Sequence, residues 1–201
     1  MEHIPSSAHR SRRLILRQHD SASTAFMIAE VMGWQNIGVT EKKVFRKKAL
    51  HIAWEMSPQV VLSYLSDSKQ RTSYMLVTSK STSDLDPYVT QLVGTGLDFY
   101  TPEELVEEVG SAKTPEAKGL ALVQSGIGAP GRPTRPYVDA YFEAIRSPST
   151  SVRMSAITAM GYAEWPEFLE LLDAVSVEDG DRHVRGHAKN MAAAFRKAAR
   201  G

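Results

Sequence analysis

The sequence contains no cysteine among its 201 residues, and this absence excludes several kinds of chemistry. Disulfide bonds, thiol nucleophiles and cysteine-ligated metal sites cannot form, and a chain without disulfides fits a reducing compartment. Long apolar runs are also missing, since none approaches the roughly 18 apolar residues of a membrane-spanning helix. The basic opening segment holds only Leu14-Ile15-Leu16 as an apolar run, which is too short for the core of a signal peptide. We therefore expect a cytoplasmic protein that does not enter a membrane.

An excess of charge of either sign is absent as well. Lys and Arg number 24, Asp and Glu number 23, and the formal net charge is +1. This balance argues against a protein that coats nucleic acid over its whole surface and leaves room only for a local basic patch. The hydrophobic content of 42% is typical of a globular chain rather than a disordered one. Residues 1–20 are predicted to be a basic, partly ordered lead-in to the first helix.

The clearest positive feature is an internal repeat near the C-terminus. The stretches "SVRMSAITAM" and "HVRGHAKNMA" both contain Val-Arg followed by an Ala three residues after the Arg, and Arg153 and Arg185 lie 32 residues apart. Apolar residues around them recur at steps of three and four, which predicts a helix with one buried face. Gly161 is predicted to end the first of these helices, and Pro166 to begin a second. The repeated unit is therefore predicted to be a helical hairpin.

The same pattern extends along the chain. First helices are predicted at Glu41–Met56, Ser68–Thr78, Thr114–Gln124, Ser149–Met160 and Arg182–Arg200, and helices that begin with proline at Pro58, Pro87, Pro136 and Pro166. A capped helix is predicted after Thr101, and "YMLVTS" is the only short apolar run that fits a strand. Because an isolated hairpin cannot bury its apolar face, repeated hairpins must stack. We therefore expect an all-α protein, a right-handed α-solenoid of five to six hairpins that forms a single domain over residues 21–201.

Two segments carry a resemblance to a known family. "SPSTSVRMSAITAMG" and "DGDRHVRGHAKNMAAAF" resemble HEAT repeats, especially the short bacterial variety; the match is good over 148–198 and weaker over 40–146. In HEAT-like stacks an Arg such as Arg153 or Arg185 commonly bonds to loop carbonyls or carboxylates of a neighbouring repeat. Such stacks are widely used as interaction scaffolds. The resemblance implies a non-catalytic module that binds a protein partner through the solenoid surface, without a cofactor.

A second resemblance gives the alternative function. "VFRKKALHIAWEMSPQVVLSYL" is similar to a segment of DNA-alkylation-repair glycosylases, which are also built from HEAT-like helical pairs. Those enzymes take their catalytic Asp from a segment of the Trp-Asp-x-Val-Asp type. Here Trp34, Trp54 and Trp165 are followed by Gln, Glu and Pro, so the catalytic Asp is missing. This resemblance therefore implies nucleic-acid binding without the glycosylase chemistry.

Candidate binding residues lie on the last predicted helix. Five basic residues share one face: Arg182, Arg185, Lys189, Arg196 and Arg200. Their separations of 3, 4, 7 and 4 residues place them within an arc of about 60°, at about 100° per residue. One interpretation is a solvated face that keeps the helix soluble. The other is a binding site for an anionic partner, which is either an acidic protein surface or a phosphate backbone.

A second basic cluster, "EKKVFRKKALHIAW", is predicted to place Lys43 and Lys47 on the same side of a helix as Trp54. Lysines beside an aromatic ring can grip a phosphate while a base stacks on the ring. The alternative is that the lysines are exposed and Trp54 packs in the core.

Two further motifs are interpreted as structural. His183 and His187 have the i, i+4 spacing that can present two imidazoles to a metal, but Val184 stands where catalytic zinc sites place Glu. No third ligand accompanies them, so we expect exposed histidines and no metal site. "GIGAPGRP", which begins at Gly126, lacks the Lys-Ser/Thr of a phosphate-binding loop and is predicted to link two helices.

Overall fold

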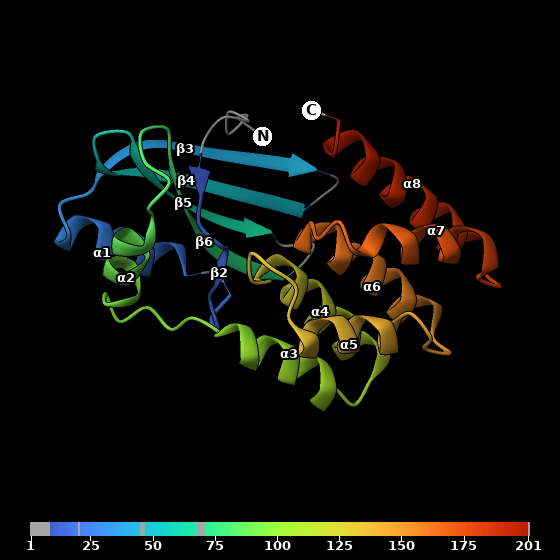
Figure 1. Cartoon of the computed structure of the whole chain (residues 1–201). Helices are drawn as coiled ribbons and strands as arrows, with labels where there is room; N and C mark the ends of the chain where they lie inside the picture. The colour runs from blue at the N-terminus through green and yellow to red at the C-terminus, as the bar shows by residue number, and fades with distance from the viewer. Residues whose placement is uncertain (1–8, 20, 45–46, 68–70, 201) are drawn as a thin grey trace. The chain divides into compact units, whose positions relative to one another are not determined.

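The computed structural model describes residues 9–19, 21–44, 47–67 and 71–200, with the side chains of 42–48 left out. The chain divides into two compact units, Met1–Tyr100 and Thr101–Gly201. The first unit holds β1 His9–Arg10, β2 Leu14–Ile15, α1 Ala22–Val31, β3 Gln35–Val44, β4 Lys47–Ser57, β5 Val60–Asp67, β6 Thr72–Ser79 and α2 Asp86–Val93. The second holds α3 Pro102–Ser111, α4 Pro115–Ile127, α5 Arg135–Ala144, α6 Thr150–Ala163, α7 Phe168–Glu178 and α8 Arg182–Ala198 (Figure 1).

The first unit is built on a six-stranded antiparallel sheet in the order β1-β6-β5-β4-β3, with β2 also paired to β6. Strands β3 to β6 form a meander in which each strand pairs with the next along the chain (Figure 1). β1 and β2 occupy residues that were predicted to lead into a helix. The expectation of an all-α solenoid over residues 21–201 is therefore wrong, because half of the chain forms a mixed α/β unit.

Side-chain alternation explains why these segments are strands. In β4, Ile52 and Trp54 are buried on one face, and the same alternation recurs at Leu62 and Tyr64 of β5. These side chains share a core with Ala25 and Ala29 of α1, Leu92 of α2 and Leu85, the residue before α2. The helices predicted at Glu41–Met56 and Ser68–Thr78 are wrong, because a period of two also places apolar residues four apart. "YMLVTS", the only strand candidate in the sequence, does lie in β6.

Pro58 illustrates the second reason for the error. It was predicted to open a helix, but it lies in the two-residue connection between β4 and β5. The next residue, Gln59, has φ 66°, a left-handed conformation that reverses the chain between the strands. Proline suits the first position of such a turn for the same reason that it suits the start of a helix, since both need φ near −65°.

The second unit is helical, as predicted. Its helices agree with the expected segments after Thr101, Thr114 and Ser149, and the predicted cap of α3 is a capping box. Thr101 Oγ1 accepts a hydrogen bond from Glu104 N, while Glu104 Oε2 accepts one from Thr101 N. The described helices form three hairpins, α3–α4, α5–α6 and α7–α8, in place of the expected five to six.

The second helices of the hairpins pack in a row, with α6 between α4 and α8 (Figure 1). Two glycines allow this close approach. A Cβ on Gly126 would lie 2.5 Å from the Cα and the carbonyl oxygen of Ala159, and one on Gly161 would collide with the side chain of Met191. The prediction that Gly161 ends its helix is wrong, because α6 continues to Ala163. The segment that begins at Gly126 does link two helices, although its first two residues still belong to the last turn of α4.

The small residues of the repeat provide a stability test. Ala156 has no exposed surface and lies in α6 between the neighbouring helices. Ala156→Leu should lower the free energy of unfolding by about 1–3 kcal/mol, because the added methylenes have no space. Ala193→Leu, at an exposed position of α8, is the matched control and should change it by less than about 0.5 kcal/mol. Denaturant unfolding measures both values, and an unchanged midpoint for Ala156→Leu would contradict this packing.

Candidate functional site

The Arg of the repeat is held by a network at the ends of the hairpins. Arg153 in α6 donates from Nε and Nη2 to the two carboxylate oxygens of Asp179, at 2.8 and 3.0 Å, and from Nη1 to the carbonyl oxygen of Ser147 at 2.9 Å. The side chains of Arg153 and Asp179 are only 14% and 8% exposed. The hydrogen bonds to Asp179 raise the pKa of Arg153, and those from Arg153 lower the pKa of Asp179. The predicted structural role of Arg153 is confirmed.

Asp179 also organises the start of the last helix. Its carboxylate accepts a hydrogen bond from Asp181 N at 2.8 Å, and Asp181 in turn caps α8 by accepting from His183 N at 2.7 Å. The backbone hydrogen bond from His183 is the main cause that lowers the pKa of Asp181. The loop before α8 is therefore fixed by one cation from α6 and by its own acidic side chains.

The basic face of α8 is partly used within the fold. Arg185 Nη1 donates to the carbonyl oxygen of Asp179 at 2.6 Å, and Arg196 pairs with Asp173 of α7 at 2.5 Å. Arg182 and Lys189 are exposed. Over residues 182–200 the sequence contains six basic residues and no acidic one. We call the five of them that share one side the α8 basic face: Arg182, Arg185, Lys189, Arg196 and Arg200.

Lys118 is a third member of the repeat that the sequence pattern did not reveal. The N-caps of α4, α6 and α8 are Thr114, Ser149 and Asp181. Four residues after each cap stands a cation: Lys118, Arg153 or Arg185. Lys118 Nζ pairs with Glu143 of α5 at 2.9 Å. The sequence signal that could have identified Lys118 is its spacing from the N-cap, because the Val-Arg dipeptide is absent from α4.

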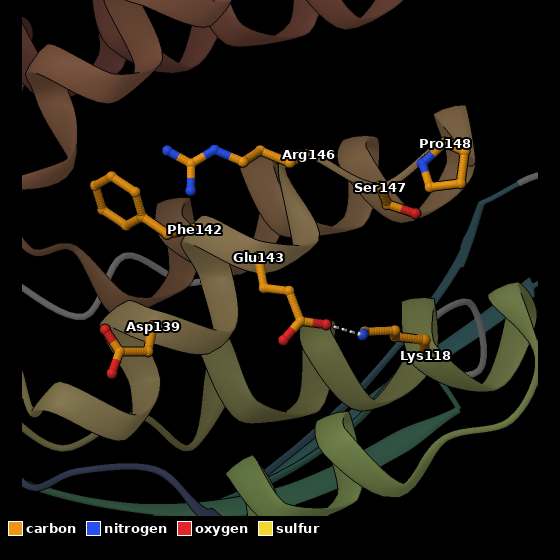
Figure 2. A pocket seen from close by; sticks show the side chains of 7 residues that line it. All are labelled: Lys118, Asp139, Phe142, Glu143, Arg146, Ser147 and Pro148. Atoms are coloured by element: carbon orange, nitrogen blue, oxygen red, sulfur yellow. Dashed lines mark hydrogen bonds and ion pairs between the residues drawn. The ribbon is translucent and has the colours of Figure 1, made fainter.

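Lys118 also borders a surface depression of about 540 Å³ in the helical unit. Figure 2 shows its lining, in which Lys118 points toward Glu143 while Asp139 lies apart from this pair. The guanidinium of Arg146 lies 5.9 Å from the ring centroid of Phe142. Its charged groups are balanced, two cations against two carboxylates. Lys118 and Glu143 pair with each other, and Asp139 pairs with Arg135.

The two histidines of the i, i+4 pair have different surroundings. His187 Nε2 lies 3.0 Å from the hydroxyl of Thr158 in α6, and partial burial lowers its pKa. His183 is exposed at the first turn of α8, close to Arg182 Nε at 3.4 Å. Within the described ranges, no group of three or more His, Asp or Glu side chains is placed to hold a metal ion. The prediction that both histidines are exposed therefore holds for His183 only, because His187 is partly buried and its ring contacts the hydroxyl of Thr158.

The other predicted basic cluster lies in the sheet unit. Lys43 is on β3 and Lys47 on β4, at the closed end of the β3–β4 hairpin, and their side chains lie outside the described part. Trp54 is buried in the core, with the ring of Phe26 5.3 Å away in an edge-on contact. The proposed helix face that combined these lysines with Trp54 does not exist, whereas the alternative of a core tryptophan is confirmed.

An apolar surface that the sequence analysis missed lies in the same unit. Five of the seven large apolar side chains that are exposed in the described structure come from α1 and β3. We call them the α1–β3 apolar surface: Phe26, Met27, Val31, Ile37 and Val39, with exposed fractions of 40, 60, 85, 50 and 54%. β3 is the terminal strand of the sheet, so no described strand pairs with its outer edge.

Among the described residues, no helix is both long and apolar enough to span a bilayer. Comparisons with known proteins give no further guide, since the chain matches no protein-family model, no curated protein and no solved structure.

Proposed function

We propose that the protein is a non-catalytic interaction module of the cytoplasm that binds another protein through the α1–β3 apolar surface. The observation that carries the proposal is the concentration of exposed apolar side chains in one segment of the chain, from Phe26 to Val39, in which Ala29 and Trp34 are buried. Exposed apolar side chains that gather in one region are typical of protein interaction sites. The stretch from Ser21 to Thr40 contains no Lys or Arg, which favours a protein partner over nucleic acid at this site.

The position of β3 suggests how the partner binds. The outer edge of a terminal strand carries N–H and C=O groups that can pair with an extended segment of another chain. β3 is ten residues long, and a bulge lies between Asn36 and Gly38. Val39 pairs with Ile52 and so lies on the face that carries α1 and the core. An added strand would thus gain backbone hydrogen bonds along β3 and apolar contacts with Val39 and α1.

Site-specific photo-crosslinking tests this proposal. A photoreactive phenylalanine analogue at Ile37 should crosslink a partner protein in native lysate, whereas the same analogue at Val177 should not. Val177 is a matched control because it is 78% exposed but lies on α7 in the other unit. The partner should protect amides of β3 from hydrogen exchange in the purified complex.

Charge substitutions provide the second arm of the test. The double substitution Ile37→Lys and Val39→Lys should weaken binding of the crosslinked partner by about tenfold or more, because two charges replace apolar contacts. Val177→Lys should leave binding unchanged. Retained binding by the double variant, or crosslinks only between copies of this chain, would contradict the proposal. Binding of random duplex DNA that depends on the α8 basic face would favour the nucleic-acid alternative.

A further inference from the structure

We propose that α8, in the last described hairpin of the stack, binds an acidic helical segment of a partner protein, whose carboxylate docks on Arg185. The proposal concerns α8 and is independent of the α1–β3 apolar surface. The repeat within the stack points to this site. In the second helix of each hairpin, the fourth residue after the N-cap is a cation, and the seventh is a buried alanine: Ala121, Ala156 and Ala188.

In the first two hairpins this cation binds a carboxylate of the following hairpin. Lys118 of α4 pairs with Glu143 of α5, and Arg153 of α6 binds both carboxylate oxygens of Asp179, which precedes α8. A two-point contact between guanidinium and carboxylate has defined geometry and is stronger than a neutral hydrogen bond. The carboxylate thus contributes to joining each hairpin to the next.

Arg185 has the backbone contact of this arrangement but not the carboxylate contact. Arg153 Nη1 donates to the carbonyl oxygen of Ser147, six residues earlier, and Arg185 Nη1 donates to the carbonyl oxygen of Asp179, also six residues earlier. The backbone contact therefore holds both guanidinium groups in equivalent positions. Among the described residues, Arg185 makes this backbone contact but is not bonded to a carboxylate as Arg153 is to Asp179.

The charges around Arg185 indicate which kind of partner fits there. Arg185 lies on the α8 basic face, where residues 182–200 carry six cations and no acidic group, and Lys189 follows it one turn later on the same side. A partner that continues the stack would bring a carboxylate to Arg185 and further acidic groups to Lys189 and Arg182. The two internal contacts at the equivalent positions are made by carboxylates, so we assign the site to an acidic protein segment rather than to a phosphate backbone.

A peptide copied from this chain can serve as the probe. Residues 165–181 contain α7 and the loop with Asp179, and they include six acidic residues and no basic one. Added to the full chain, this peptide should shift the Arg185 Nε–Hε signal in NMR spectra in a saturable manner. A peptide in which Asp179 is replaced by asparagine should bind about tenfold more weakly, because it cannot form the charged two-point contact.

Variants of the chain complete the test. Arg185→Gln should weaken peptide binding by about tenfold, and so should Lys189→Glu, which alters an exposed residue and so protects the test against a folding defect. Lys113→Gln removes an exposed cation from the α3–α4 loop and should leave binding unchanged. The proposal is overturned if the Arg185 signal does not shift, or if the asparagine peptide binds equally well. It is also overturned if short duplex DNA binds more tightly than the peptide through Arg185, or if a second copy of the chain occupies the face in sedimentation measurements.

Discussion

Gly126→Ala is expected to lower the free energy of unfolding by about 3 kcal/mol or more, although alanine is normally the better helix former. The added Cβ would lie 2.5 Å from Ala159 Cα and from the carbonyl oxygen of the same residue. Both are backbone atoms of α6, so no side-chain rotation relieves the collision. The two helices must separate, and the loss of packing between α4 and α6 exceeds the gain of about 1 kcal/mol in helix propensity.

Gly186→Ala is the matched control because it makes the same chemical change inside a helix with open surroundings. No atom outside its own turn lies within 4 Å of a Cβ placed on Gly186. It should therefore raise the free energy of unfolding by up to about 1 kcal/mol. Urea unfolding of both variants and the wild type measures the two effects. Equal changes of the same sign would show that α4 and α6 are not in close contact at Gly126.

The helical unit was largely predictable from sequence because its signals are local. Thr101 and Thr114 are caps that accept a backbone hydrogen bond three residues later, and both are followed by proline. Steps of three and four residues place Val152, Ala156 and Ala159 on the buried side of α6, where all three have an exposed fraction of 2% or less. Caps and periodicity depend only on residues close together in the chain, so a sequence contains them in full.

The sheet was not predicted because the pairing of strands depends on segments that lie far apart in the sequence. Leu50 and Trp54 are four apart, which satisfies a helical face and a strand face equally. What makes β4 a strand is its pairing with β3 on one side and β5 on the other. The order of strands then decides which one lies at the edge, so exposure of Ile37 and Val39 could not be inferred from their own sequence.

The site was predicted in part for the same reason. The structural role of Arg153 follows from the resemblance to a repeat, but its partner Asp179 is 26 residues away. The sequence predicts Arg196 in a basic stripe that is either solvated or bound to an anionic partner, and the structure pairs it with Asp173 of the preceding helix. The periodicity of the sequence shows which residues share a helix face, but it does not show which neighbouring residue contacts that face.

Asp179→Asn is the second change with a large expected effect, and it should lower the free energy of unfolding by about 3 kcal/mol at neutral pH. The substitution keeps the shape of the side chain but leaves the guanidinium of Arg153, only 14% exposed, without its counter-charge. Asp139→Asn is the matched control. Asp139 pairs with Arg135 at 3.4 Å, but both side chains are mostly exposed, so the loss should stay below about 1 kcal/mol.

The difference between the wild type and Asp179→Asn should also depend on pH. The hydrogen bonds from Arg153 hold the pKa of Asp179 below its ordinary value of about 3.9 in an unfolded chain. As the pH falls below about 4, the unfolded chain binds this proton before the folded protein does, so the wild type loses stability that the asparagine variant never had. The two unfolding free energies should therefore differ most above pH 5 or so and converge as the pH falls through the pKa of the folded protein. Urea unfolding of both proteins from neutral to acidic pH measures this difference. A constant difference over that range would mean that the charge of Asp179 does not stabilise the fold, and that its role is limited to the hydrogen bonds an asparagine can also make.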